Sequence, residues 1–195
     1  MGSRLTPIHP DLHGIAKKFP RLPINRWTVP LSRWMIGLMP LPRVADDVDV
    51  RETTAGSGES ARGVKLRVYR PKETTTFAPA LVWMHGGGLV IGNARMHDPQ
   101  MVKFVQTLGI VVVSVDYRLA PRHPYPAAID DCYTALKWTH ANAGSLGIDP
   151  DRIAVGGASA GGGLAAALAQ MAHDRGEVEV ACQLLVYPML DDRSC

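Results

Sequence analysis

The stretch Arg152-Ile-Ala-Val-Gly-Gly-Ala-Ser-Ala-Gly-Gly-Gly163 decides the fold of this chain. Residues 153–155 are apolar and prone to form a strand, and they run directly into a G-x-S-x-G sequence at 157–161. This pattern is typical of a serine on a sharp strand-to-helix turn, where the flanking glycines leave room for the chain to fold back. The sequence therefore predicts a nucleophile elbow with Ser159 at its tip.

The residues after the turn have the pattern of a helix that packs closely on a sheet. Leu164, Leu168 and Met171 repeat at i, i+4 and i+7, and alanines stand at positions 165, 166, 167 and 169. The N-terminus of such a helix points at Ser159 and favours negative charge there.

The motif alone leaves a structural turn or a phosphate-binding turn open, and dinucleotide binding is the main competitor. That fingerprint fits poorly, because Ala158 stands where a second glycine must approach the pyrophosphate. The acidic residues expected about 20 positions on, Glu177 and Glu179, precede the next apolar run instead of ending it. A serine with a chemical role remains the better interpretation.

The composition is that of an ordinary soluble globular protein. The chain has 195 residues, of which 46% are hydrophobic and 20% charged, enough for one substantial core. The net charge of +3 comes from dispersed residues with no basic run longer than Lys17-Lys18, so we expect no nucleic-acid partner.

Cysteine usage and hydropathy indicate the compartment. Cys132, Cys182 and Cys195 are an odd number without C-x-x-C spacing, which disfavours a disulfide framework and a structural zinc site. The N-terminus lacks a signal-like apolar run, and no window approaches the ~18 apolar residues of a transmembrane helix. We expect a cytoplasmic protein with reduced thiols and no transmembrane segment.

Residues 1–45 form a separate N-terminal region of short helices cut by prolines. Asp11 is expected to cap a first helix and Pro30 to start a second. The predicted apolar faces are Leu12, Ile15, Ala16 and Phe19 in the first helix, and Leu31, Trp34, Met35 and Leu38 in the second. These faces must cover something, either as a packing arm on the main domain or as a cap over a substrate site. We expect no metal at His9 and His13, because Pro10 lies between them.

Residues 46–195 have the pattern of an α/β domain. Residues 48–50 and 64–68 alternate apolar and polar side chains and predict an antiparallel pair of strands. Buried strands are expected at 80–84, 110–115, 153–155 and 181–187, separated by helices at 98–108, 126–143 and after Ser159. The helices are expected to turn Met101, Phe104, Val105, Leu108, Ile129, Cys132, Tyr133 and Leu136 inward. This alternation predicts a mostly parallel sheet with helices on both faces and ligands at the carboxyl ends of its strands.

A glycine loop after the expected 80–84 strand is a second motif with a possible chemical role. His85 is followed by Gly86, Gly87 and Gly88, and such a run is useful where a ligand atom must approach backbone N–H groups. We expect the N–H groups of Gly87, Gly88 and Ala160 to form an oxyanion hole. His85 and Gly86 are expected to support the loop, and His85 is not expected to act as the catalytic base.

The chain resembles the bacterial hormone-sensitive-lipase-like carboxylesterases of the α/β-hydrolase fold. The resemblance rests on the His85 loop, on the elbow, on Asp116-Tyr-Arg-Leu-Ala-Pro-Arg-His-Pro-Tyr-Pro-Ala-Ala128 and on Leu185-Val-Tyr-Pro188. It implies hydrolysis of short-to-medium acyl esters through an acyl-enzyme, without cofactor or metal, and N-terminal helices that cap the site. Two positions depart from the family pattern: Ala158 stands where Asp is usual, and Arg122 where Glu is usual.

In this fold the catalytic acid and histidine follow the serine along the chain. His173 lies on the same predicted helix about 21 Å from the elbow, so it cannot reach Ser159. Asp191 and Asp192 follow the last predicted strand, and no histidine comes after them. We therefore expect the chain to lack the triad Asp and His and the last strands of the sheet, and to have at most residual activity alone.

Two alternatives to the esterase stay open: a non-catalytic small-molecule binder, for which the plant gibberellin receptors are a precedent in this family, and an inactive fragment. The expected partner is a small acyl ester, and the sequence is compatible with a homodimer.

Overall fold

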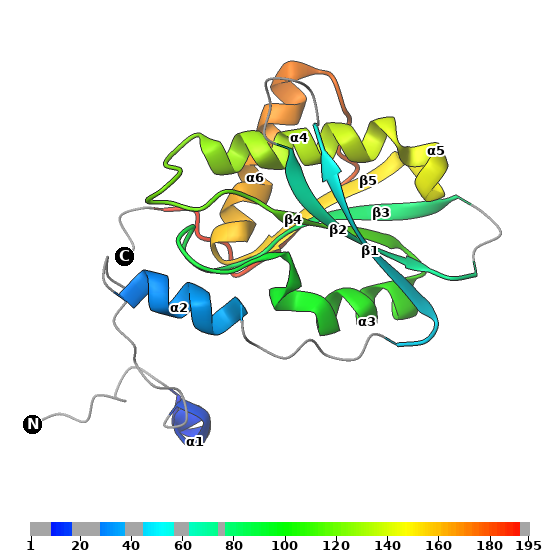
Figure 1. Cartoon of the computed structure of the whole chain (residues 1–195). Coiled ribbons are helices and arrows are strands. Elements are labelled where there is room, and N and C mark those ends of the chain that lie inside the picture. The colour runs from blue at the N-terminus through cyan, green and yellow to red at the C-terminus, as the bar shows by residue number, and fades with distance from the viewer. Residues whose placement is uncertain (1–8, 17–27, 38–44, 57–62, 74–76, 192–195) are drawn as a thin grey trace, which may run out of the picture.

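A six-stranded mixed sheet with the order β1-β2-β4-β3-β5-β6 forms the centre of the protein (Figure 1). The structure is a computed structural model that describes residues 9–16, 28–37, 45–56, 63–73 and 77–191. β1 pairs with β2 and β2 with β4 in antiparallel fashion, whereas β4, β3, β5 and β6 run parallel. The strands are β1 (Val48–Ala55), β2 (Val64–Pro71), β3 (Ala78–Met84), β4 (Val111–Asp116), β5 (Ile148–Ala158) and β6 (Gln183–Val186).

Helices cover both faces of this sheet, as the strand and helix alternation predicts. α4 (Ala127–Ala141) and α6 (Ala160–Arg175) lie on one face, and α3 (Asp98–Leu108) lies on the other (Figure 1). The other helical elements are η1 (Pro10–Leu12), α1 (His13–Ala16), α2 (Thr28–Gly37), η2 (Ala94–His97) and α5 (Ala143–Leu146). The chain thus has the α/β architecture expected from its sequence.

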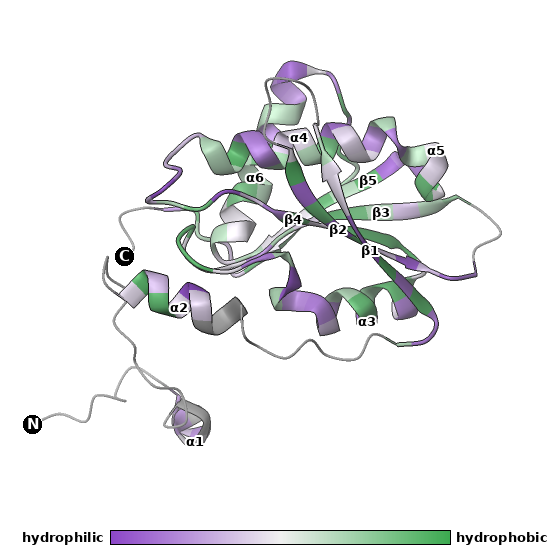
Figure 2. Cartoon of the chain, viewed as in Figure 1, coloured by the Kyte–Doolittle hydropathy of each residue, from purple (hydrophilic) through white to green (hydrophobic). Residues whose placement is uncertain are grey.

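Each face of the sheet has its own hydrophobic core. Val82 and its neighbours pack against Leu136 of α4 and Leu168 of α6, and all three side chains are fully buried. On the other face, Trp83 packs with Met101 and Val105 of α3. Hydrophobic colour is accordingly concentrated on the central strands in Figure 2. The two cores explain why β3 carries apolar side chains on both of its faces.

Most predicted inward faces are confirmed. Ile129, Cys132, Tyr133 and Leu136 of α4 are all buried. Leu108 is an exception, because its side chain is 61% exposed. It ends α3, and the left-handed Gly109 that follows, with φ +63°, takes the chain away before the last turn can pack.

The N-terminal region differs from expectation where the structure describes it. His9, and not Asp11, caps the first helical turn, with its Nδ1 accepting from the N–H of Asp11. In α2, Leu31 and Trp34 are 56% and 63% exposed, so the predicted apolar face does not pack on the domain there. Phe19 and Leu38 lie outside the described residues, as do the side chains of Leu12, Ile15, Ala16 and Met35.

Two further observations concern the expected lack of a transmembrane segment and the expected reduced thiols. Within the described ranges, no helix is long and apolar enough to cross a bilayer. Cys132 is a buried free thiol whose pKa is raised by that burial, Cys182 is a free exposed thiol, and Cys195 lies outside the described residues.

Candidate active site

Ser159 lies on the turn between β5 and α6 with φ +55° and ψ −118°. This backbone conformation is strained for a residue with a side chain, at a cost of about 1–3 kcal/mol. Three backbone hydrogen bonds hold it: the Ser159 N–H donates to Val186 O at 3.0 Å, and Ser159 O accepts from the N–H of Gly163 at 3.0 Å and of Met189 at 2.9 Å. The turn is therefore supported by α6 and by the chain after β6.

The glycines on either side of the turn are required by close backbone contacts. A Cβ added to Gly157 would stand 2.2 Å from the carbonyl oxygen of Gly161, and one added to Gly161 would stand 2.1 Å from that of Met84. Real Cβ atoms do not approach oxygen so closely. The G-x-S-x-G spacing thus follows from the packing of β3, β5 and α6 at one point.

The segment after β6 closes over the start of α6, which explains two more glycines. A Cβ at Gly162 would lie 3.0 Å from Pro188, and one at Gly163 would lie 2.3 Å from the carbonyl oxygen of Met189. Sequence reasoning predicted neither contact. The Gly-Gly pair after the elbow is the signal that could have revealed them.

The glycine loop lies directly beside Ser159. An added Cβ on Gly86 would stand 3.6 Å from the Cβ of Ser159 and 3.1 Å from the carbonyl oxygen of Ala158. Gly87 and Gly88 have φ values of +121° and +61°. Among the described residues, their N–H groups donate to no backbone carbonyl, whereas Gly87 O accepts from the N–H groups of Val90 and Ile91.

Ala160 is the first residue of α6, so its N–H has no partner within the helix. This N–H belongs to the helix end that carries partial positive charge, directly after Ser159. The structure thus brings together the elbow and the glycine loop, two sequence motifs that lie about 70 residues apart.

His85 is fully buried behind this loop. Its Nδ1 lies 2.7 Å from the carbonyl oxygen of Gly86, and the ring packs against Gly92, where an added Cβ would be 2.5 Å from Nδ1. Burial lowers the pKa of His85 to about 4, so the imidazole is neutral at physiological pH and Nδ1 can donate to Gly86. The imidazole thus contacts the glycine loop, and its role as a support for that loop stays a prediction.

Tyr117 is a supporting residue that sequence reasoning missed. Its hydroxyl donates to the carbonyl oxygen of His85 at 2.6 Å, and its ring stacks on the imidazole with centroids 4.2 Å apart and planes 9° apart. The Asp116-Tyr-Arg sequence at the end of β4 was the available signal, because β4 is the immediate neighbour of β3 in the sheet.

The Ser159 hydroxyl has no basic partner in the part of the chain that the structure describes. It makes no capping hydrogen bond to α6. The imidazoles of His9, His85 and His97 contact Asp11, Gly86 and Trp83 instead. His173 is an exposed residue in the last turn of α6. No group of three or more His, Cys, Asp or Glu side chains in the described residues could hold a metal ion.

Comparison with known proteins agrees with this geometry. A family described as alpha/beta hydrolase fold matches residues 81–195. The chain is 44% identical over 147 residues to the carboxylesterase NlhH of Mycobacterium tuberculosis, covering 75% of this chain and 46% of that protein. The chain belongs to the hormone-sensitive-lipase-like carboxylesterase family of the α/β-hydrolase fold.

Solved structures of esterases superimpose closely on this member of the family. A structure described as bacterial heroin esterase has a TM-score of 0.87 at 42% identity, covering 98% of this chain and 61% of that chain. The esterase LipW of Mycobacterium marinum has a TM-score of 0.85 at 37% identity, covering the same shares of each chain. The chain spans about half the length of the curated relatives that it matches.

Proposed function

We propose that this protein hydrolyses carboxylic esters of short-to-medium acyl chains, with Ser159 as the nucleophile. The observation that carries the proposal is the proximity of the glycine loop to the elbow, with the Gly86 backbone against the Ser159 side chain. N–H groups of the loop and of α6 then converge on the space above the hydroxyl. An ester carbonyl that reaches Ser159 would have its oxygen beside these donors.

In the proposed reaction, Ser159 Oγ attacks the carbonyl carbon and the carbonyl oxygen becomes an oxyanion. The N–H groups of Gly87, Gly88 and Ala160 stabilise this charge, and each such donor is typically worth about 10²–10³ in turnover. The tetrahedral intermediate expels the alcohol and leaves an acyl-serine, which water hydrolyses to the acid. A general base must accept the serine proton, and we assign none among the described residues.

A second candidate is a non-catalytic binder of small ester-like molecules, for which the contact between Gly86 and Ser159 would serve equally well. Such a protein would use the same loop and elbow to hold a carbonyl group without turnover. We also propose that the N-terminal helices cover the site and that the protein works in the cytoplasm without a cofactor or metal.

Labelling with a fluorophosphonate probe, combined with hydrolysis of 4-nitrophenyl acetate and butyrate, separates the two candidates. The esterase predicts labelling and turnover that both disappear in Ser159→Ala. Ser145→Ala is the matched control, because Ser145 is an exposed serine on α5 whose hydroxyl donates to Asn142 O. Saturable binding of an ester without labelling or turnover would favour the binder.

A further inference from the structure

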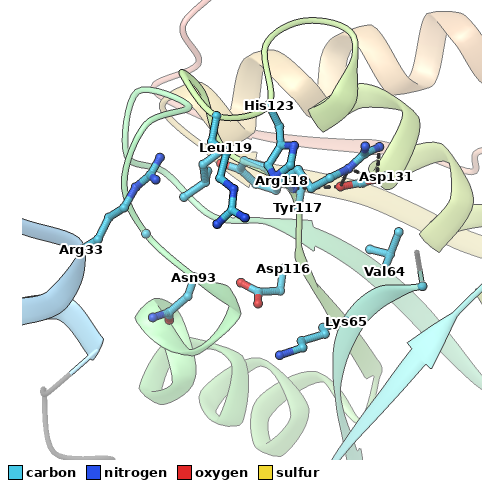
Figure 3. Close-up of a pocket in the computed structure, with 13 residues that line it drawn as sticks. Arg33, Val64, Lys65, Asn93, Asp116, Tyr117, Arg118, Leu119, His123 and Asp131 are labelled. Atoms are coloured by element: carbon cyan, nitrogen blue, oxygen red, sulfur yellow. Dashed lines mark hydrogen bonds and ion pairs between the residues drawn. The ribbon is translucent and has the colours of Figure 1, made fainter. Parts of the chain in front are cut away.

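A cavity of about 500 Å³ lies at the carboxyl edge of the sheet, on the β2 and β4 side of the elbow. The start of β2, the loops after β3 and β4, and α2 form its walls (Figure 3). Ser159, Gly87 and Gly88 do not line this cavity. A molecule bound there would not take the place of a reacting ester carbonyl.

The ionisable side chains that line the cavity carry an excess of positive charge. They are Arg33, Lys65, Arg118, Arg122, His123, Asp116 and Asp131. Arg118 and Asp131 neutralise each other, because two nitrogens of the guanidinium lie 2.7–3.0 Å from the carboxylate oxygens. Three permanent cations then face a single carboxylate.

The single carboxylate, that of Asp116, already has Lys65 as a neighbouring positive charge. Asp116 and Lys65 are register partners on β4 and β2, and both side chains project into the cavity (Figure 3). Asp116 also accepts from the N–H of Ala94 at 3.3 Å, and burial raises the pKa of its carboxyl. Among the side chains that the structure describes, Arg33 and Arg122 are therefore left without a counter-charge.

Two backbone carbonyl groups hold the guanidinium of Arg33 through its Nε and Nη2 atoms. Its Nε donates to Val90 O at 2.8 Å and its Nη2 to Ala120 O at 2.7 Å. Carbonyl oxygens orient a guanidinium without neutralising it. Within the described ranges Nη1 has no acceptor, so its two N–H groups can donate to a ligand. Within the described residues, Arg122 forms no ion pair.

We propose that this cavity binds a small oxyanion, a carboxylate or a phosphate, through Arg33, Lys65 and Arg122. Guanidinium groups match the geometry of such anions, and an anion would relieve the repulsion between neighbouring cations. The anion is either a free solute or a carboxylate carried by an ester substrate.

Isothermal titration calorimetry on the Ser159→Ala protein at low ionic strength tests this proposal, since the variant prevents turnover and low salt limits screening. Inorganic phosphate and monoethyl succinate are titrated separately. Phosphate that binds at least as tightly as the half-ester identifies a free anion as the ligand. Tighter binding of the half-ester identifies a substrate carboxylate. Absence of binding by both anions overturns the proposal.

Three variants in the same background locate the binding. Arg122→Glu should weaken it about tenfold or more, because one charge-assisted contact is worth about 1.5–3 kcal/mol. Lys103→Glu makes the same change in net charge on the exposed side of α3 and should leave the affinity within about twofold. Asp116→Asn keeps an acceptor for Ala94 and should tighten binding by removing the opposing carboxylate. Equal affinity in Arg122→Glu and Lys103→Glu, or no gain in Asp116→Asn, would show that the anion binds elsewhere.

Discussion

The Tyr117 hydroxyl donates a 2.6 Å hydrogen bond to the carbonyl oxygen of His85, and the two rings stack with their centroids 4.2 Å apart. His85 immediately precedes the glycine loop and its Nδ1 lies 2.7 Å from Gly86 O. Tyr117, which directly follows β4, thus contacts both the backbone and the side chain of His85. The glycine loop beside Ser159 begins at the next residue.

We expect Tyr117→Phe to lower ester turnover about tenfold with little change in KM, because it keeps the stack but releases the loop backbone. The lost buried hydrogen bond should reduce the free energy of unfolding by about 1–2 kcal/mol. Steady-state kinetics and urea unfolding measure both effects. Tyr133→Phe, which removes a buried hydroxyl from α4, serves as control. Equal losses of turnover in the two variants would contradict a role of Tyr117 in positioning the loop.

Gly161→Ala should reduce the free energy of unfolding by about 3 kcal/mol, because the added Cβ would meet the backbone oxygens of Met84 and His85 at 2.1 and 2.4 Å. Gly144→Ala is the matched change on α5, where an added Cβ meets nothing within 4 Å. It should be neutral or stabilise by up to about 1 kcal/mol. Thermal or urea unfolding compares the two, and a tolerated Gly161→Ala would show that β3 and α6 do not approach as closely as described.

Gly88→Val should abolish most turnover at a modest cost in stability. An added Cβ there meets only Val90, at 3.9 Å, so the expected cost of about 1–2 kcal/mol comes from the left-handed backbone. Turnover should fall at least about 10²-fold, because the side chain enters the space proposed for the oxyanion.

Gly109 is a close control for this variant, since its φ of +63° matches the +61° of Gly88 and its surroundings are open. Gly109→Val, at the end of α3, should lose similar stability and keep normal turnover. Parallel loss of turnover and stability in both variants would mean that the glycine loop has only a structural role.

The buried His85 predicts a pH dependence of stability. Its pKa is about 4 in the folded protein because burial disfavours the imidazolium, against about 6.5 in an unfolded chain. Between these values the unfolded chain binds a proton that the folded chain does not. The contribution of the neutral His85 to the free energy of unfolding is therefore fully present above about pH 6.5. This contribution is lost as the pH falls toward 4.

His85→Asn removes the titrating group and keeps a donor for Gly86 O, so its urea midpoint should fall less between pH 7 and pH 4.5 than that of the wild type. Identical pH slopes in the two proteins would show that another group dominates acid destabilisation.

The sequence by itself determined the fold class and the two motifs of the candidate site. Gly157 and Gly161 imply a tight turn around Ser159, and the apolar runs around Val82 and Val113 imply buried parallel strands. Both features can be predicted because they depend on residues that are close together in the sequence. The helix expected at 98–108 has the bounds of α3, and the one expected at 126–143 differs from α4 by one residue at its start and two at its end.

The tertiary structure alone decided which distant residues meet. The contact of Gly86 with Ser159, and that of Tyr117 with His85, depend on the order β4-β3-β5 in the sheet. Leu31 and Trp34 have a helical apolar pattern, yet they are exposed, because a pattern predicts a face without saying what covers it. The charge of the cavity likewise follows from bringing Arg33, from the N-terminal region, to residues of three other segments. No local pattern encodes such a meeting, because it results from packing between elements far apart in the chain.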